Sequence, residues 1–458
     1  MTRTTAPREG GRWIQRWDPE DETFWRETGR PIARRNLLYS VLSEHIGFSV
    51  WSLWSVLVLF MGPAYGIDPA GKFFLIATAT CVGALVRIPY TFAVARFGGR
   101  DWTVVSALLL LAPTVAALVV MEPGTSYGTF LAVAALTGVG GGNFASSMTN
   151  INAFFPLREK GRALGLNAGG GNIGVPVVQL AALLVIATAG AGHPRLLLAA
   201  YVPLIVAAAG LALVRMDNLA PVRSDAGAVR EALRERHTWI VAFLYVGTFG
   251  SFIGYGFAFG LVLQTRFGHT PLQAASLTFL GPLLGSLARP VGGALADRFG
   301  GARITLAAFV AMAAATGVVV LASVRDSLPV FLTGFVALFA LSGAGNGSTY
   351  KMVPGIFHAQ ALARGLEGVR AAAYGRRLSG AAMGLIGAVG ALGGLGINLV
   401  FRQAFQNGGS GTAAFLTFLG FYAACCAVTW AVYLRRPGPD RAAAAAAGST
   451  AKSQLTPV

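Results

Sequence analysis

Long apolar runs, each of roughly 18 residues or more, recur along the whole 458-residue chain. Folded as a helix, each run can cross the hydrocarbon core of a bilayer, which is about 30 Å thick. The runs are continuous, whereas the strands of a membrane barrel alternate between apolar and polar residues. Hydrophobic residues make up 54% of the chain and charged residues only 12%, too few to cover a soluble surface. The sequence therefore predicts an all-α membrane protein.

The apolar runs predict twelve transmembrane helices in two halves of six. A linker at 215–237 would join an N-terminal half at 37–214 to a C-terminal half at 238–434. A polar segment at 1–36 and an alanine-rich tail at 435–458 are expected to be cytoplasmic and mobile. The expected helices lie at 37–63, 73–96, 102–121, 126–149, 160–187, 195–214, 238–264, 272–296, 302–323, 329–356, 376–401 and 412–434.

Basic residues gather in alternate loops, which is the bias of cytoplasmic loops in membrane proteins. This pattern predicts that both termini are cytoplasmic, and it accounts for the net charge of +17 without nucleic-acid binding. The three cysteines, Cys81, Cys425 and Cys426, lie in apolar runs and show no metal-ligand spacing. Neither a metal nor a cofactor is expected.

An internal repeat predicts the arrangement of the halves. The segment "VRIPYTFAVARFGGR" resembles "ARPVGGALADRFGGAR", and their arginines Arg87 and Arg289 lie 202 positions apart. At nearly the same offset, Asn143 in "LTGVGGGNFASSM" corresponds to Asn346 in "LSGAGNGSTYKM", and we expect both amides to bridge helices. Two parallel six-helix halves are the arrangement of the major facilitator fold. The segment "GGALADRFGGAR" also resembles that superfamily's loop motif, in which Asp297 would act as a charge latch at a helix end.

Arg87 and Arg289 are the candidate ligand-binding residues. Each lies well inside an apolar span, where an arginine costs on the order of 2.5–3.5 kcal/mol on insertion scales. An ion pair with a buried carboxylate would be the structural explanation, but Glu44 is almost the only acidic residue within the spans. Two arginines without enough counter-charge imply that the missing anion is the ligand. The planar guanidinium group favours planar oxyanions.

Aromatic residues and glycines complete the pattern. Tyr245 and Phe249 share one helix face, and with Phe144 they stand among small residues, so they are candidates to wall a pocket rather than only to pack. The glycine stripes predict close packing that lets helices slide during transport. The glycines assigned to packing or gating are Gly140, Gly141, Gly142, Gly169, Gly170, Gly171, Gly384, Gly387, Gly390, Gly393 and Gly394.

The segments "GGGNFASSM", "ALGLNAGGGNIG" and "GTFGSFIG" and the glycine run at 380–396 resemble the nitrate/nitrite porter (NarK-type) family of the major facilitator superfamily. The resemblance covers nearly the whole chain. It implies exchange or uptake of nitrate and nitrite across the bacterial inner membrane. It also implies that the substrate-binding residues are Arg87, Arg289, Phe144, Phe249, Tyr245 and Asn172.

The mode of transport remains open between nitrate/nitrite exchange, which the near-absence of midplane carboxylates favours, and nitrate–proton symport. The possible coupling residues are Glu44, His45 and Lys351, although Lys351 lies close enough to a helix end to reach the headgroups. A sensor built on a transporter fold is the alternative from another class. No nucleophile–base pair suggests an enzyme. We expect a monomer.

Overall fold

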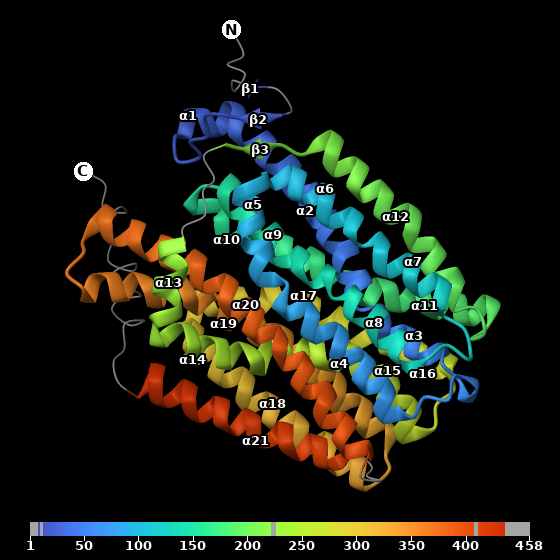
Figure 1. Ribbon diagram of the computed structural model, residues 1–458. Coiled ribbons are helices and arrows are strands. Elements are labelled where there is room, and N and C mark those ends of the chain that lie inside the picture. Colours follow the sequence, from blue (N-terminus) through green and yellow to red (C-terminus); the bar gives the residue numbers. More distant parts are fainter. Residues whose placement is uncertain (1–7, 10–11, 221–225, 407–410, 436–458) are drawn as a thin grey trace.

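The computed structural model describes residues 8–9, 12–220, 226–406 and 411–435, and nearly all of them form one bundle of long helices (Figure 1). Within these residues, eleven helices are long and apolar enough to cross a membrane. A twelfth, formed by α16 (Pro271–Thr278) and α17 (Leu280–Phe299), has comparable length but carries Arg289, Asp297 and Arg298. The all-α fold predicted from the apolar runs is therefore confirmed.

The N-terminal half contains six spans, most of them interrupted once. At each break the α-helix is interrupted for a short stretch inside the span, so such a span consists of two consecutive helices. The elements are α2 (Arg30–Trp51), α3 (Leu53–Phe60), η2 (Pro63–Tyr65), α4 (Pro69–Leu85), α5 (Arg87–Phe97), α6 (Gly99–Leu109), α7 (Leu111–Val120), α8 (Tyr127–Thr137), α9 (Val139–Phe154), α10 (Leu157–Asn172), α11 (Gly174–Ala189) and α12 (Pro194–Arg215).

The C-terminal half follows a short helix, α13 (Ala226–Arg234), in the linker between the halves. Its first span contains a π-helical turn, η3, a feature that is frequent at functional sites. Besides α16 and α17, its elements are α14 (Arg236–Tyr245), η3 (Val246–Gly250), α15 (Ser251–Phe267), α18 (Gly301–Val324), α19 (Leu328–Ala363), α20 (Gly368–Gln406), α21 (Thr412–Thr429) and η4 (Trp430–Leu434).

The internal repeat is visible in the backbone. Gly98 ends α5 with φ of 86°, and its repeat partner Gly300 ends α17 with φ of 92°. This is a region that residues with a Cβ rarely adopt, so the repeated "RFGG" sequence makes the same helix–turn–helix corner in both halves. Arg87 and Arg289 lie the same distance before these corners, and both are buried.

The N-terminal segment is ordered, which corrects the expectation of a mobile extension for its described residues. It contains β1 (Arg8–Glu9), β2 (Trp13–Ile14), α1 (Glu22–Phe24) and the π-helical turn η1 (Trp25–Gly29). β2 pairs antiparallel with β1 and parallel with β3 (Asn218–Leu219), which follows α12. Ile14 and Trp25 are buried. Residues 436–458 of the expected tail lie outside the described residues.

The same end of the bundle carries both the small sheet and α13, while α3 and α16 lie at the opposite end (Figure 1). The beginning of the linker is fixed to this end: Asp217 binds Arg35 and Asn36 of α2. The side-chain oxygen of Asn218 accepts a hydrogen bond of 2.8 Å from the backbone N–H of Arg100, near the start of α6. The helix α2 begins at Arg30, earlier than the expected span at 37–63.

Candidate functional site

Arg87 is the first residue of α5, directly after the break that ends α4, and it is fully buried. Its Nε donates to the carbonyl of Gly141 on α9 at 3.1 Å, and one terminal nitrogen donates to the carbonyl of Gly387 on α20 at 3.0 Å. Arg87 therefore joins a helix of its own half to a helix of the other half. Its second terminal nitrogen, Nη2, has no hydrogen-bond partner among the described residues.

Arg289 lies on α17 and is 6% exposed. Its Nη2 donates to the hydroxyl of Tyr245 at 3.4 Å, while its Nη1 has no partner in the described part of the chain. Tyr245 ends α14 and is fully buried. Each arginine therefore keeps one buried terminal nitrogen that is free to donate to a ligand, and an unpaired buried donor of this kind is costly unless a ligand takes it.

Aromatic rings surround the two guanidinium groups. The carbon Cζ of Arg87 lies 4.7 Å from the ring centre of Phe144 and 5.0 Å from that of Phe249, and Cζ of Arg289 lies 5.9 Å from the ring of Phe144. The rings of Phe144 and Phe249 are nearly parallel, with centres 6.1 Å apart. The ring of Tyr245 stacks on that of Phe249 with centres 5.2 Å apart, and the π-helical turn η3 begins between these two residues. The structure thus brings five of the predicted site residues together.

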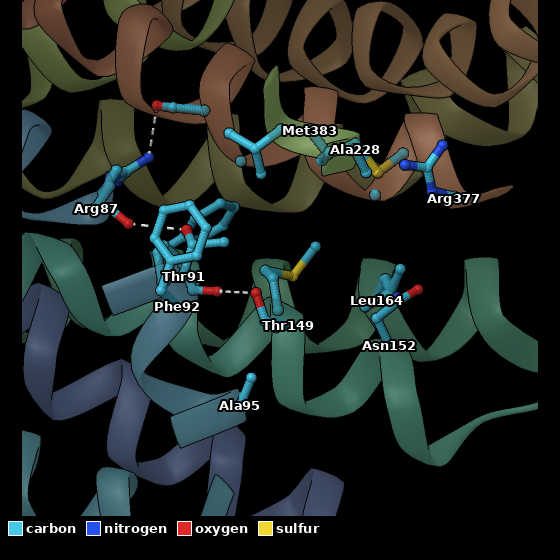
Figure 2. Close-up of a pocket in the computed structure, with 18 of the residues that line it drawn as sticks. Arg87, Thr91, Phe92, Ala95, Thr149, Asn152, Leu164, Ala228, Arg377 and Met383 are labelled. Carbon is cyan, nitrogen blue, oxygen red and sulfur yellow. Dashed lines mark hydrogen bonds between the residues drawn. The ribbon is translucent and has the colours of Figure 1, made fainter. Parts of the chain in front are cut away.

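A cavity of about 260 Å³ begins at Arg87 and runs toward α13. Figure 2 shows Arg87 near one end of this cavity and Arg377 of α20 near the other. Ala228 and Val229 of α13 line the same cavity, so the linker helix covers part of its mouth. Gly384 and Gly387 of α20 line it as well.

Asn172 is the one predicted substrate-binding residue that makes no hydrogen bond or ring contact with the other five in the described part of the chain. It ends α10, is buried, and its amide makes no hydrogen bond with the described residues. Asn143 and Asn346 were expected to bridge helices through their amides, and this expectation was wrong. Neither amide has a hydrogen-bond partner among the described residues, and the Asn143 amide packs against Gly47 of α2 instead.

Lys351 pairs with a carboxylate outside the group of residues around the two arginines. Its Nζ donates to both carboxylate oxygens of Asp297 at 2.8 Å, and the Lys351 side chain is 40% exposed. This is the carboxylate that was predicted to act as a charge latch near the end of α17. The pairing gives Lys351 a structural partner, so nothing in its geometry requires a role in the anion path.

Glu44 is fully buried on α2 and is held by two donors. Its Oε2 accepts from the hydroxyl of Ser147 at 2.5 Å and from the amide of Asn167 at 2.7 Å. Its Oε1 has no partner among the described residues. The neighbouring His45 places Nδ1 3.3 Å from the carbonyl of Gly170 on α10.

Most of the predicted packing glycines lie where a side chain would collide. A Cβ at Gly390 would lie 2.3 Å from the ring of Tyr245, and one at Gly171 would lie 2.2 Å from Oε1 of Glu44. Gly169 has open space beside it. Close contacts under 3.0 Å are also expected for a Cβ at Gly140, Gly141, Gly142, Gly170, Gly393 and Gly394, whereas Gly384 and Gly387 have no contact closer than 3.4 Å.

Sequence reasoning missed two members of the site. The ring of Trp51 on α2 lies 5.1 Å from Cζ of Arg87. Tyr350 on α19 lines the cavity and packs against Tyr245, with ring centres 5.3 Å apart. One signal was present: Tyr350 lies at the same repeat offset from Ser147 as Asn346 does from Asn143.

At the mouth of the cavity, α13 is attached to the C-terminal half by a charged network. Glu231 accepts from Arg364 at 3.1 Å and from Arg377 at 3.0 Å, and Tyr374 also donates to it. The Tyr374 hydroxyl, followed by the two arginines, holds the pKa of Glu231 below its usual range. Glu235 accepts from Arg364 and Gln360.

Comparison with known proteins gives a consistent family. The model of the Major Facilitator Superfamily matches residues 45–397. The nitrate/nitrite transporters NarU of Salmonella typhimurium and Escherichia coli are each 38% identical to the chain, over 92% of this chain and 96% of each relative. A probable nitrate/nitrite antiporter of Thermus thermophilus, NarK2, is 34% identical over 76% of this chain and 83% of its own length.

Solved structures share the fold at low sequence identity. A D-xylose-proton symporter superimposes with a TM-score of 0.62 at 15% identity, covering 87% of this chain and 97% of that protein. A bacterial homologue of the human lysosomal transporter Spinster, in an inward-facing and unoccupied conformation, has a TM-score of 0.61 at 16% identity, covering 88% and 97%. These likenesses support the fold alone.

Proposed function

Since the chain belongs to the nitrate/nitrite porter family of the major facilitator superfamily, we propose that it transports nitrate and nitrite, with the anion bound between Arg87 and Arg289. The observation that carries this proposal is the pair of buried guanidinium groups, each with one unpaired terminal nitrogen, at repeat-equivalent positions. A planar monovalent oxyanion can accept from both donors at once.

The aromatic walls favour a flat anion, but they require a small adjustment. An anion stacked between two rings needs about 7 Å between them, which is twice the contact distance of about 3.5 Å. The centres of Phe144 and Phe249 are 6.1 Å apart, so these rings must separate by roughly 1 Å for an anion to stack between them. The Tyr245 hydroxyl, now bound by Arg289 at 3.4 Å, is a further donor for the anion.

We propose exchange by alternating access, with nitrate taken up and nitrite released. In the empty carrier, Arg87 and Arg289 repel each other, which disfavours closing the halves around them. A bound anion offsets this repulsion, so the loaded carrier changes conformation more readily than the empty one. The hydrogen bond from Arg87 to Gly387 of α20 supports this scheme, because it links anion binding to the interface between the halves.

The cavity is proposed to face the cytoplasm of the bacterial inner membrane, with both termini on that side. The basic loops and α13 lie at the cavity's open end, in keeping with the positive-inside bias. On the opposite side the halves touch each other, for example where Gln179 of α11 donates to the carbonyl of Gly256 on α15 at 2.8 Å. We propose a monomer, because all of these groups come from one chain.

Counterflow in proteoliposomes tests the exchange. Vesicles loaded with nitrite should take up labelled nitrate, and vesicles loaded with chloride should not, even when a pH gradient is imposed across the membrane. Nitrate uptake that is driven by a proton gradient into vesicles without internal nitrite would instead establish nitrate–proton symport. Absence of both kinds of uptake, with nitrate binding retained, would favour the sensor alternative.

A further inference from the structure

Glu44 is a buried carboxylate that the exchange scheme does not use. It lies one helical turn from Phe48 on α2, and the ring of Phe48 packs edge-on against Phe144 with centres 6.0 Å apart. Phe144 in turn lies against both arginines. Glu44 is therefore linked to the proposed anion site through the rings of Phe48 and Phe144.

Polar groups surround Glu44 and leave room for one water molecule. Ser147 and Asn167 donate to Oε2, while Oε1 lies against the backbone of Gly171 without a donor. A polar cavity of about 10 Å³ is lined by Glu44, by Asn143 and by hydroxyls of α2, α6 and α9. Ser43, which lines this cavity, also has a buried hydroxyl without a partner in the described residues. One water molecule fits there and can bring a proton to the carboxyl group.

The charged groups that act on Glu44 belong to the anion site. Arg87 of α5 and Arg289 of α17 attract the carboxylate, and Tyr350 of α19 is a titratable but neutral group within electrostatic range of it. His45 is its titratable neighbour on α2, but its Nδ1 faces Gly170. The groups that α6, α9 and α10 present to Glu44 are hydroxyls, amides and Gly171, none of which is charged. The titratable Tyr201 of α12 interacts with Ser49, which lies farther along α2.

We propose that Glu44 is a proton-binding site linked to the anion site, so that a proton and a nitrate ion bind cooperatively. This inference rests on the function proposed above. With Glu44 ionised, the arginines and Glu44 together carry one net positive charge; with Glu44 protonated they carry two. The ionised carboxylate competes with nitrate for the field of the arginines, and protonation removes this competitor. Because linkage is reciprocal, bound nitrate must weaken the hold of the arginines on the carboxylate and raise its proton affinity by the same factor.

Nitrate titrations of the purified transporter over a pH series test the linkage. Nitrate and the arginines keep their charges across this range. The wild-type protein should bind nitrate more weakly as the pH rises, by roughly 5- to 150-fold in total, the usual range for two coupled sites. Glu44→Gln, which carries no charge, should bind nitrate as tightly as the protonated wild-type protein at every pH. Glu44→Asp should keep the pH dependence.

Two variants are matched controls. Glu122→Gln removes a carboxylate of an exposed ion pair with Arg195 and should behave like the wild type. His45→Asn should also keep the pH dependence. If Glu44→Gln keeps the wild-type pH dependence, or if His45→Asn abolishes it, the proposal is wrong.

A measurement on the wild-type protein alone keeps the proposal testable if Glu44→Gln does not fold. Addition of nitrate to a weakly buffered solution of the transporter should cause proton uptake, reported by a pH-sensitive dye. Nitrate binding without proton uptake at any pH overturns the linkage and leaves the proposed function intact. A folded wild-type protein that does not bind nitrate at any pH refutes the proposed function and this inference together.

Discussion

Replacement of Arg87 by lysine separates the charge of this residue from its planar, forked shape. Arg87 uses two nitrogens to bind the carbonyls of Gly141 and Gly387, at 3.1 and 3.0 Å, and leaves a third for the anion. A lysine ammonium group is a single compact charge, so it cannot contact the carbonyls of Gly141 and Gly387 and the anion all at once. At least one hydrogen bond from a charged group is therefore lost, which costs about 1.5–3 kcal/mol.

We expect the lost bond to be the one to the anion, so nitrate affinity should fall by roughly 10- to 150-fold, since 1.4 kcal/mol corresponds to a factor of ten. Calorimetric titration of purified Arg87→Lys with nitrate measures this change, and counterflow should fall to background. The matched control is Arg266→Lys at the other end of the bundle, where Arg266 binds the carbonyl of Ser323 and Asp326. Nitrate affinity within twofold of the wild type in folded Arg87→Lys would refute the reasoning.

Three further predictions concern other parts of the structure. Gly390→Ala should lower the counterflow rate, because its Cβ would lie 2.3 Å from the Tyr245 ring, whereas Gly169→Ala, with open space beside it, should leave the rate unchanged. Lys351→Met should retain exchange and change the free energy of unfolding by only about 0–1 kcal/mol, since exposed ion pairs contribute little; loss of counterflow in this variant would assign Lys351 to the path. The pKa of Glu231 is lower in the folded protein than in the unfolded chain, so the ionised carboxylate stabilises the attachment of α13. This contribution is fully present above the unfolded-state pKa and should be lost as the pH falls through the folded-state pKa. The protection of α13 against hydrogen exchange, corrected for the pH dependence of the intrinsic exchange rate, should therefore fall on acidification, and Glu231→Gln should show low protection already at neutral pH; equal protection in both proteins would contradict this role.

The part of the site that depends on the internal repeat was predictable from the sequence. Arg87 and Arg289 stand out because a buried arginine is costly and because the repeat places them at equivalent positions. The corners at Gly98 and Gly300 show the same repeat in the backbone. Tyr245 and Phe249 were predictable as a pair because they lie four residues apart on one helix.

Interactions that depend on tertiary contacts were not predictable in the same way. Lys351 was read as an intramembrane charge, but its partner Asp297 comes from a different helix, at a place that helical periodicity does not reveal. The polar segment before α2 looked like an extension because its composition is mixed; its buried Ile14 and Trp25 pack against residues that follow α9 and α12. Trp51 resembles any aromatic residue of a membrane helix until the arginine beside it is known.

The central claim is that Arg87 and Arg289 hold the anion between them, and a structure of the transporter determined with bound nitrate tests it most directly. We predict density for a planar anion within hydrogen-bond distance of the free terminal nitrogens of both arginines, with the rings of Phe144 and Phe249 farther apart than 6.1 Å. Nitrate bound at another place, with both arginines keeping their present contacts, would contradict the account.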